Sequence, residues 1–442
     1  MFYPKSPFLK NPGIESQIFK RNSPEVKKIL EWLCISPKHT TYRINLLKTT
    51  REEAKSYITK IIEAKFRKPP SIFLLDEVPE VLCISSIDEI PVFNPELKEV
   101  IVDIYCGSAL LRGAHVYGPG VLAMNTGTQL NEKVNVFADL AGKCKKGTNV
   151  FYDCKEKVFI GIGITKMQRY QLYGKNVDSS GIAVEMLQVI SGVPSLGDLS
   201  SDKILLQNLP SIVCSKVLNP QPDEVILDMC AAPGNKTSHI VELTKNENVV
   251  IAIDKINSKI EALKKKIELN QWNNVYAFCF DSTKGIDLTK TDKSLETIRN
   301  GPPFAPEAFD RILLDAPCSS LGNRPLLSST ISQNMLKSYS KMQKKLFENA
   351  VRLLKIGGTL VYSTCTIHQD ENEEIIVWAK KKFDELKLVP AEPIFGGVAI
   401  ETDGLAEKER SYLQRFCINN VQTNISTIGF FIAKFIKVKS SF

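Results

Sequence analysis

The sequence has few residues of the kinds that bind metal ions. Its four histidines (His39, His115, His239 and His368) lie far apart, and its eleven cysteines include no Cys-x-x-Cys pair. Structural zinc sites combine closely spaced Cys and His ligands. These absences disfavour a structural zinc site, and we predict no metal.

Long apolar runs are also absent. No run approaches the roughly 18 residues that a transmembrane helix needs. The first sixteen residues, MFYPKSPFLKNPGIES, lack the apolar segment of a secretory signal. We therefore expect a cytoplasmic protein with reduced cysteines and no membrane partner.

Two phosphate-binding patterns are missing as well. No segment matches G-x-x-x-x-G-K-[ST] or G-x-G-x-x-G, which disfavours a P-loop and a dinucleotide fingerprint. What the sequence does have is a formal net charge of +8. This charge is compatible with a polyanionic partner such as RNA, although basic enzymes without nucleic acid are common.

The length of 442 residues suits two or three domains. Residues 1–95 are predicted to form an α/β extension. In NSPEVKKILEWL, Ser23 is placed to N-cap a helix that begins at Pro24. TTYRINLLK predicts a strand, and the helix after it begins with a capping box of Thr50 and Glu53.

The rest of the chain divides at about residue 190. Residues 96–190 alternate short β-rich runs with glycines, which predicts a small β-barrel. Residues 191–442 alternate strands and helices as in an open, mostly parallel sheet. The predicted strands are EVILDMC, NVVIAID, NVYAFCF, DRILLDA and GGTLVYSTC. The polar segment 283–309 is predicted to be a surface loop.

A turn of small residues follows the first of these strands. The strand ends at Asp228, and Cys230-Ala231-Ala232-Pro233-Gly234 then opens a helix that contains Lys236. Small residues let the backbone approach a ligand, and a helix N-terminus supplies free N–H groups. This turn is therefore a candidate cofactor loop.

Two carboxylates end the next two strands. Asp254 follows NVVIAI, where an acidic side chain can accept from both ribose hydroxyls, and Asp281 follows NVYAFCF, where it can accept from an adenine amine. Strand-end aspartates also commonly cap the following helix. Their serial placement, beside a loop without phosphate-binding glycines, favours a nucleoside cofactor without phosphates. S-adenosylmethionine fits that description.

Two cysteines follow the last two strands: Cys318 in DAPCSSLG, after Asp315, and Cys365 in VYSTCTIH. A lone free cysteine is most often a buried core residue. A thiolate, however, can add to C6 of a pyrimidine and make C5 nucleophilic enough to take a methyl group. Residue type alone does not distinguish the nucleophile from the helper.

Three motifs carry a resemblance to a known family. DMCAAPGNKT, LLDAPCSSLG and YSTCTIHQDENEEII resemble the motif set of the Sun-domain (NSUN-type) RNA cytosine-C5 methyltransferases, over about residues 195–440. The resemblance implies a class I Rossmann-like methyltransferase core, with Cys365 as nucleophile, Cys318 assisting product release, and Asp315 and Lys236 lining the pocket and polarising the base. It departs from many members at Asn235, which we expect to tolerate positive φ in the turn. The implied cofactor-binding residues are Cys230, Ala231, Ala232, Pro233, Gly234, Asn235, Lys236, Asp254, Asp281 and Asp315.

In the β-rich insert, CGSALLRGAHVYGPGVL and the later GIGIT resemble a PUA domain, as in the NSUN-type member that carries one. That resemblance implies binding of tRNA through the acceptor stem and the CCA end. Arg112, Tyr117, Lys145 and Lys146 combine cations for phosphate with a ring for stacking, although exposed lysines are common in solvated loops.

Two histidines lie near these motifs. His115 is predicted to be structural. His368 could be a general base for Cys365, but the stretch that begins with it is better interpreted as the start of a helix.

The sequence thus predicts an S-adenosylmethionine-dependent tRNA cytosine-C5 methyltransferase acting near the 3′ acceptor end. Alternatives are an rRNA or mRNA cytosine-C5 methyltransferase and a non-catalytic RNA-binding scaffold that retains the fold. A DNA cytosine methyltransferase is disfavoured, because its chemistry uses the Pro-Cys thiol alone and has no need of Cys365.

Overall fold

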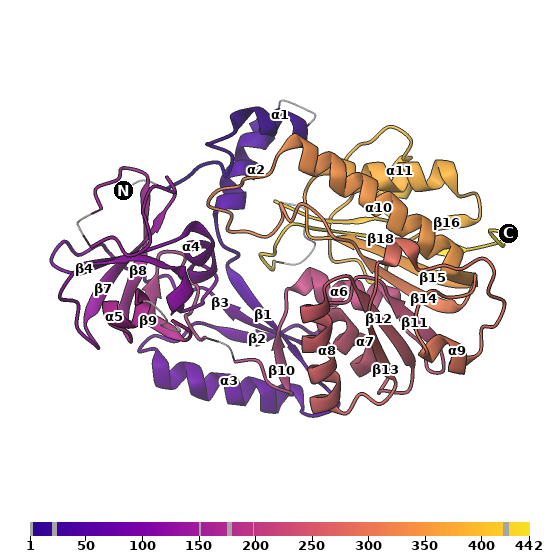
Figure 1. The fold of residues 1–442 in the computed structure, drawn as a ribbon, viewed down its shortest axis with the longest axis horizontal. Coiled ribbons are helices and arrows are strands. Elements are labelled where there is room, and N and C mark those ends of the chain that lie inside the picture. The colour runs from indigo at the N-terminus through magenta and orange to yellow at the C-terminus, as the bar shows by residue number, and fades with distance from the viewer. Residues whose placement is uncertain (1–2, 20–23, 150–151, 175–178, 198, 419–423) are drawn as a thin grey trace.

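The computed structural model describes residues 3–19, 24–149, 152–174, 179–197, 199–418 and 424–442, and within them the strands form three sheets (Figure 1). The N-terminal sheet lies between the other two. The sheet of the β-rich insert is at one end of the molecule, and the sheet of the C-terminal half is at the other (Figure 1).

The N-terminal sheet is antiparallel and has the strand order β10-β1-β3-β2. Its capping box is confirmed, because Thr50 accepts from the Glu53 N–H and Glu53 accepts from the Thr50 N–H, each at 3.2 Å. Helix α2 begins at Pro24 as predicted, whereas Ser23 is outside the described residues. The elements are η1 (Pro12–Ile14), α1 (Glu15–Ile18), α2 (Pro24–Cys34), β1 (His39–Ile44), α3 (Arg51–Lys65), β2 (Ile72–Leu74), β3 (Val81–Ser85) and β10 (Ile204–Leu206).

Strand β10 returns to this sheet after the insert. It pairs with β1 in the register Tyr42↔Leu206 and Ile44↔Ile204. The two ends of the insert are therefore anchored on the same sheet, and the segment that enters the C-terminal half starts from it.

The insert forms a six-stranded sheet of order β5-β9-β8-β7-β4-β6. The β4–β7 pair is parallel and the other pairs are antiparallel. Helix α4 is N-capped by Asp103, whose carboxylate accepts from the Cys106 N–H at 2.8 Å. The elements are β4 (Lys98–Val102), α4 (Ile104–Leu110), β5 (Val116–Tyr117), η2 (Gly118–Gly120), β6 (Val121–Met124), β7 (Lys133–Asp139), β8 (Lys157–Thr165), α5 (Arg169–Leu172) and β9 (Ile182–Val189).

The C-terminal half contains the predicted open sheet. Its order is β13-β12-β11-β14-β15-β18-β16, with β17 beside β18. The five predicted strands are confirmed as β11 to β15 and are mutually parallel, whereas β16, β17 and β18 make antiparallel pairs. The elements are α6 (Leu209–Leu218), β11 (Val225–Asp228), α7 (Asn235–Leu243), β12 (Val249–Asp254), α8 (Asn257–Asn270), β13 (Val275–Cys279), η3 (Ser282–Lys284), α9 (Leu295–Arg299), β14 (Phe309–Asp315), α10 (Gln333–Leu353), β15 (Leu354–Thr364), η4 (Gln369–Glu371), α11 (Glu373–Lys382), β16 (Leu386–Val389), α12 (Glu407–Arg410), β17 (Gln414–Phe416) and β18 (Phe430–Lys437).

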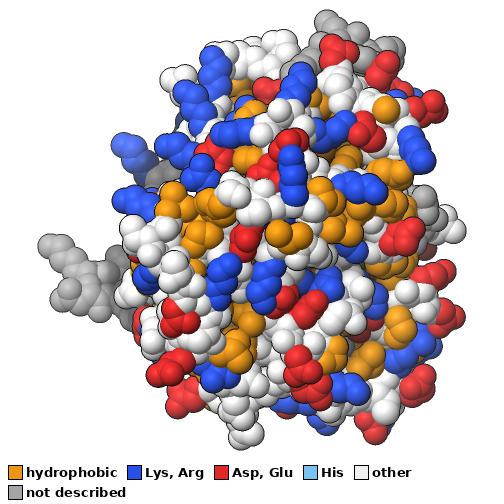
Figure 2. Space-filling model, turned by 90° about the vertical axis from the view of Figure 1, so that its right-hand side faces the viewer, with side chains coloured by type: hydrophobic (Ala, Val, Ile, Leu, Met, Phe, Trp, Pro, Cys, Tyr) orange, Lys and Arg blue, Asp and Glu red, His pale blue; other side chains and the backbone are white. Residues whose placement is uncertain are grey.

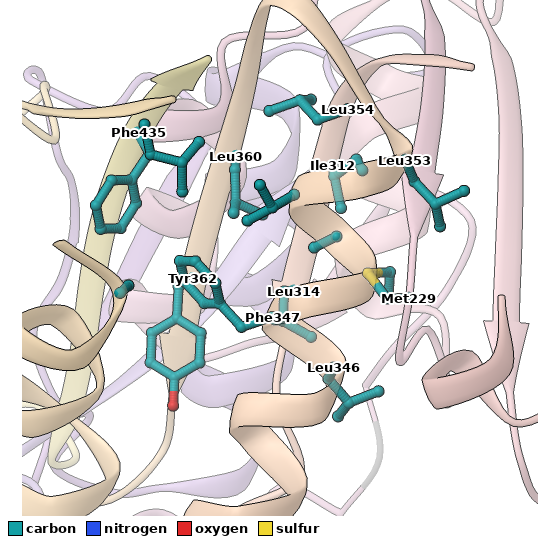
Figure 3. Close-up of a cluster of buried hydrophobic side chains, with 14 of the residues drawn as sticks. Met229, Ile312, Leu314, Leu346, Phe347, Leu353, Leu354, Leu360, Tyr362 and Phe435 are labelled. Carbon is teal, nitrogen blue, oxygen red and sulfur yellow. The ribbon is translucent and has the colours of Figure 1, made fainter. Parts of the chain in front are cut away.

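Helix α10 packs its apolar face on the strands that carry the two cysteine motifs (Figure 3). Phe347 is fully buried there, and its ring lies 5.6 Å from that of Phe435 and 5.9 Å from that of Tyr362. Each such side chain removed from water contributes about 1.5–3 kcal/mol. The strand ends that follow this core are therefore held in a rigid frame.

The prediction of a surface loop at 283–309 is confirmed for residues 288–294, which are mostly exposed and contain no helix or strand, and is wrong for the rest of the segment. The segment contains most of η3 and all of α9, which is N-capped by Ser294. Ile298 and Phe304 are 2% exposed, and the Phe304 ring packs edge-on against that of Phe309 at 5.0 Å. Ile298 and Phe304 are thus buried, whereas Leu288 and Leu295 are exposed, and a helix of five residues is too short to give a periodic pattern.

The positive charge is not gathered on the face shown in Figure 2, where basic and acidic side chains are interspersed. Each of the eleven cysteines, all of which lie in the described ranges, is a free thiol. Within those ranges, no helix combines the length and the apolar composition that crossing a bilayer requires.

Candidate active site

The candidate cofactor loop connects β11 to α7. Gly234 is the N-cap of α7 with φ of +93°, and a Cβ at this position would lie 2.4 Å from Leu263 Cδ1 on α8. The turn therefore needs glycine at 234. The expectation that Asn235 occupies the turn at positive φ is wrong, because Asn235 is the first residue of α7.

A pocket opens between this loop and the start of α6. Part of its wall is Asp228, which is 1% exposed; burial raises the pKa of its carboxyl group to about 7. Asp228 Oδ1 has no hydrogen-bond partner among the described residues, whereas Oδ2 accepts from Thr237 at 2.8 Å. The pocket is lined by Leu206, Gln207, Asn208, Ser211, Asp228, Cys230, Ala231, Ala232, Pro233, Asn235, Lys236 and Asp315.

Asp254 and Asp281 lie at the carboxyl ends of β12 and β13, which neighbour β11 in the sheet. Asp254 Oδ2 accepts from the Ala232 N–H at 3.3 Å, which brings this carboxylate to the cofactor loop. Asp281 accepts from the hydroxyl and the N–H of Thr283, and these bonds lower the pKa of its carboxyl group. Both carboxylates are thus at the edge of the sheet where the cofactor loop lies.

Lys236 and Asp315 form an ion pair, with 2.6 Å between Nζ and Oδ2. Burial opposes the charge of Lys236, but the neighbouring Asp315 carboxylate outweighs this effect and raises the pKa of the ammonium group. The other oxygen, Asp315 Oδ1, accepts from Ser363 Oγ at 2.7 Å. The pair therefore joins the cofactor loop to the ends of β14 and β15.

The two cysteines are brought together by the register of these strands. Asp315 on β14 is level with Ser363 on β15, and the loops that follow place Cys318 Sγ 3.4 Å from Cys365 Sγ. The parallel pairing of two neighbouring strands therefore converts a sequence separation of 47 residues into a thiol pair.

The surroundings of the pair make its members unequal. The hydrogen bond from Cys318 lowers the pKa of Cys365, against the effect of burial, and the Ser320 hydroxyl at 3.5 Å adds to this effect. The same bond and burial raise the pKa of Cys318. Asn323 Nδ2 also lies 3.5 Å from Cys365 Sγ. Cys365 is therefore the thiol that more readily becomes a thiolate, the reactive form.

Glu371 stabilises the cysteine loops, a role that the sequence did not predict. Its side chain is fully buried, and Oε2 accepts from the Ser319 N–H and from Gln343 Nε2, each at 2.9 Å. Oε1 lies 3.2 Å from His368 Nδ1. The only sequence signal was an acidic residue in QDENEE, a segment that we predicted as a helix start; η4 and α11 confirm that start.

The two histidines near the predicted motifs are structural. His368 is 2% exposed, and no hydrogen bond among the described residues joins it to Cys365. His115 is buried in the insert, where Nδ1 accepts from the Met186 N–H at 3.1 Å.

One predicted RNA-binding residue lies beside the cysteine loop. Arg112, together with Tyr105 on α4, lines a groove whose other wall includes Ser320 and Asn323. Tyr117 at the end of β5 and Lys145 and Lys146 in the β7–β8 connection are exposed but do not line this groove. Among the described residues, no three His, Cys, Asp or Glu side chains form a group able to hold a metal ion.

Comparison with known proteins identifies the family of the chain. The family model for the 16S rRNA methyltransferases RsmB/F matches residues 215–436, about half of the chain. The chain belongs to this family. It is a methyltransferase, and S-adenosylmethionine is its methyl donor, as the resemblance of the motifs predicted.

Several relatives resemble nearly the whole chain. A Mus musculus protein named tRNA (cytosine(72)-C(5))-methyltransferase NSUN6 is 39% identical, covering 99% of this chain and 95% of its own. An Arabidopsis thaliana protein named rRNA (cytosine-C(5))-methyltransferase NOP2C is 28% identical over 96% of this chain and 90% of its own. The crystal structure of NSun6 from Pyrococcus horikoshii with SFG matches with a TM-score of 0.73 and 29% identity over 99% of both chains.

Proposed function

We propose that this methyltransferase modifies C5 of a cytosine near the 3′ acceptor end of tRNA. The observation that carries the proposal is the pair of thiols, Cys318 and Cys365, 3.4 Å apart at strand ends beside the cofactor loop. The substrate class is supported by the NSUN6 relative, which is more similar to this chain than the Arabidopsis rRNA enzyme is.

The residues around the pocket fit an adenosyl amino acid. Small side chains at Cys230–Gly234 leave room for a ligand at the loop, and the N-terminus of α7 has no side-chain cap. Asp254 and Asp281 are placed to accept from the ribose hydroxyls and the adenine amine. When bound, S-adenosylmethionine supplies the methyl group that C5 receives.

Cys365 is the proposed nucleophile. Its thiolate attacks C6 of the cytosine, which forms a C–S bond and makes C5 nucleophilic. Asp315 and Lys236 line the pocket; as an ion pair at 2.6 Å, they are suited to bind the polar edge of the base and stabilise the charge that develops on it.

Cys318 is the proposed base for product release. After methylation, C5 carries a proton that must leave so that the C6–S bond to Cys365 breaks. While Cys365 is a thiolate, the hydrogen bond between the sulfurs keeps Cys318 protonated. Once Cys365 is bonded to C6 it is a thioether and this restraint on Cys318 ends. The Cys318 thiol can then lose its proton to solvent, and the resulting thiolate takes the C5 proton. The electron pair left at C5 forms the C5=C6 double bond as the C6–S bond breaks. The Cys365 thiolate then leaves.

The insert is the proposed RNA-binding part, with the role of a PUA domain at the CCA end. Arg112 supplies a cation beside the cysteine loop, and Lys145 and Lys146 supply exposed cations for backbone phosphates. Tyr117 is 49% exposed, which suits stacking on an unpaired base. We place the domain boundaries at 1–95, 96–190 and 191–442, and the protein in the cytoplasm.

The second candidate is an rRNA substrate, favoured by the Arabidopsis relative and by the description of the family model. No feature of the chain and no relative described above favours an mRNA substrate. A non-catalytic scaffold is disfavoured because both thiols and the Lys236–Asp315 pair are intact.

The test is methyl transfer from radiolabelled S-adenosylmethionine to purified RNAs, followed by bisulfite sequencing. The proposal predicts label in tRNA at an acceptor-end cytosine, and loss of most label when the CCA end is removed. Label in rRNA but not in tRNA would replace the proposal by the second candidate. Absence of transfer to any RNA, with the cofactor bound, would favour the scaffold.

A further inference from the structure

Arg43, on β1 of the N-terminal sheet, reaches into the methyltransferase core. Its side chain is 2% exposed, and its guanidinium donates to both carboxylate oxygens of Glu242, at 2.9 and 2.8 Å. It also donates to Ser238 Oγ at 2.6 Å and to the carbonyl oxygen of Asn235 at 2.7 Å. These three partners lie in the first and last turns of α7, so Arg43 fixes the position of the helix that follows the cofactor loop.

A fifth hydrogen bond from Arg43 orients the side chain of Gln207, which lines the same pocket as Asp228 and Asp315. A guanidinium group only donates. The atom of Gln207 that faces Arg43 must therefore be the amide oxygen, and the amide nitrogen takes the other corner of the group. Arg43, a residue of the N-terminal sheet, therefore sets the direction in which the N–H donors of Gln207 point.

The amide nitrogen of Gln207 has no partner among the described residues, although the side chain is only 5% exposed. A buried N–H group without an acceptor is unfavourable. Because Gln207 lines the pocket, this unsatisfied donor lies in the pocket wall, near the uncapped N-terminus of α7, where the N–H groups and the helix dipole also favour a negative ligand. Both features suit a carboxylate.

We propose that Gln207 is a further cofactor-binding residue, whose amide N–H donates to the carboxylate of the amino-acid part of S-adenosylmethionine, and that Arg43 is the positioning residue that orients it. The N-terminal extension then contributes to cofactor affinity as well as to the fold. The inference rests on the cofactor site proposed above.

The test compares two ligands by calorimetry on the full-length chain: S-adenosylmethionine, and 5′-deoxy-5′-methylthioadenosine, which lacks the amino-acid part. Gln207→Leu is expected to raise the Kd of S-adenosylmethionine about tenfold or more, the range for losing a hydrogen bond to a charged group. The Kd of the truncated nucleoside is expected to stay within about twofold.

Two further variants separate the roles. Gln207→Glu keeps an acceptor for Arg43 but removes the N–H donor, and is expected to weaken S-adenosylmethionine in the same way; it carries the test if Gln207→Leu fails to fold. Arg43→Lys keeps a charge but cannot hold Asn235, Gln207 and Glu242 together, and is expected to raise the same Kd several-fold.

The matched control is Arg311→Lys. Arg311 lies near the amino end of β14, whereas Asp315 is at its carboxyl end. Arg311 pairs with Glu224 and donates to the Leu218 carbonyl. It is expected to change stability without changing either Kd.

Three results would overturn the inference. Unchanged affinity of Gln207→Leu for S-adenosylmethionine would show that Gln207 makes no contact with the ligand. Equal weakening of both ligands would show that Gln207 only supports the loop. If the wild-type chain binds neither ligand, the cofactor site itself is wrong, which is a distinguishable outcome.

Discussion

Glu371 offers a prediction whose size follows from its contacts. In Glu371→Leu the Ser319 N–H loses its acceptor, and the amide of Gln343 loses one of two acceptors while keeping the Pro317 carbonyl at 3.0 Å. An unsatisfied buried donor costs about 1–3 kcal/mol, and a lost bond to a charged group about 1.5–3 kcal/mol. We expect the free energy of unfolding to fall by about 2.5–6 kcal/mol.

The matched control is Glu371→Gln. Its amide oxygen can accept from both Ser319 and Gln343, and its N–H group can face His368 Nδ1, so the expected loss is about 1 kcal/mol. Urea unfolding of the wild type and both variants measures the difference. Because Ser319 follows Cys318, the folded fraction of Glu371→Leu should also release product slowly and accumulate the covalent protein–RNA intermediate. Equal unfolding midpoints for the two variants would refute the reasoning.

Three further predictions concern charged groups. Burial lowers the pKa of His239 to about 4, so between about pH 6.5 and 4 this side chain binds fewer protons in the folded state, and its contribution to stability falls by up to about 1.4 kcal/mol per unit as the pH is lowered. The raised pKa of Asp228 acts in the opposite direction over the same range, so the measurement is the difference in the free energy of unfolding between the wild type and His239→Gln; this difference should change with pH, and a constant difference would contradict the assignment. Lys236→Met removes a cation that favours the Cys365 thiolate and leaves the Asp315 carboxylate unpaired, so the pKa of Cys365 should rise. Alkylation of that thiol, followed by mass spectrometry, should then need a higher pH than in the wild type. An identical pH profile would argue against the role of Lys236. Asp254→Ala should raise the Kd of S-adenosylmethionine about tenfold or more in calorimetry, and an unchanged Kd would remove Asp254 from the site.

The parts of the site that could be predicted from the sequence are those that follow from strand order. Asp254, Asp281, Asp315 and the two cysteines each follow an apolar run, and parallel strands bring such residues to one edge of a sheet. The register of β14 and β15 then determines that Cys318 and Cys365 meet. Apolar patterning therefore predicted where these residues lie, whereas their chemical roles were implied by the resemblance of the motifs.

The parts that could not be predicted depend on contacts between distant residues. Arg43 meets Glu242 across 199 positions, and Glu371 meets Ser319 across 52; no local pattern marks either partner. Asn235 was assigned the wrong conformation because the sequence alone did not show which residue of the turn has positive φ. Helix α9 and the buried residues of segment 283–309 were not predicted, because the buried residues of this segment are sparse.

The division of labour between the two thiols is the central claim, and trapping of the covalent intermediate tests it most directly. Cys365→Ala and Cys318→Ala are each incubated with S-adenosylmethionine and tRNA, and the products are resolved by denaturing electrophoresis. The account predicts no methylation and no adduct for Cys365→Ala, and a stable protein–RNA adduct for Cys318→Ala. Methylation by Cys365→Ala, together with no adduct for Cys318→Ala, would contradict it.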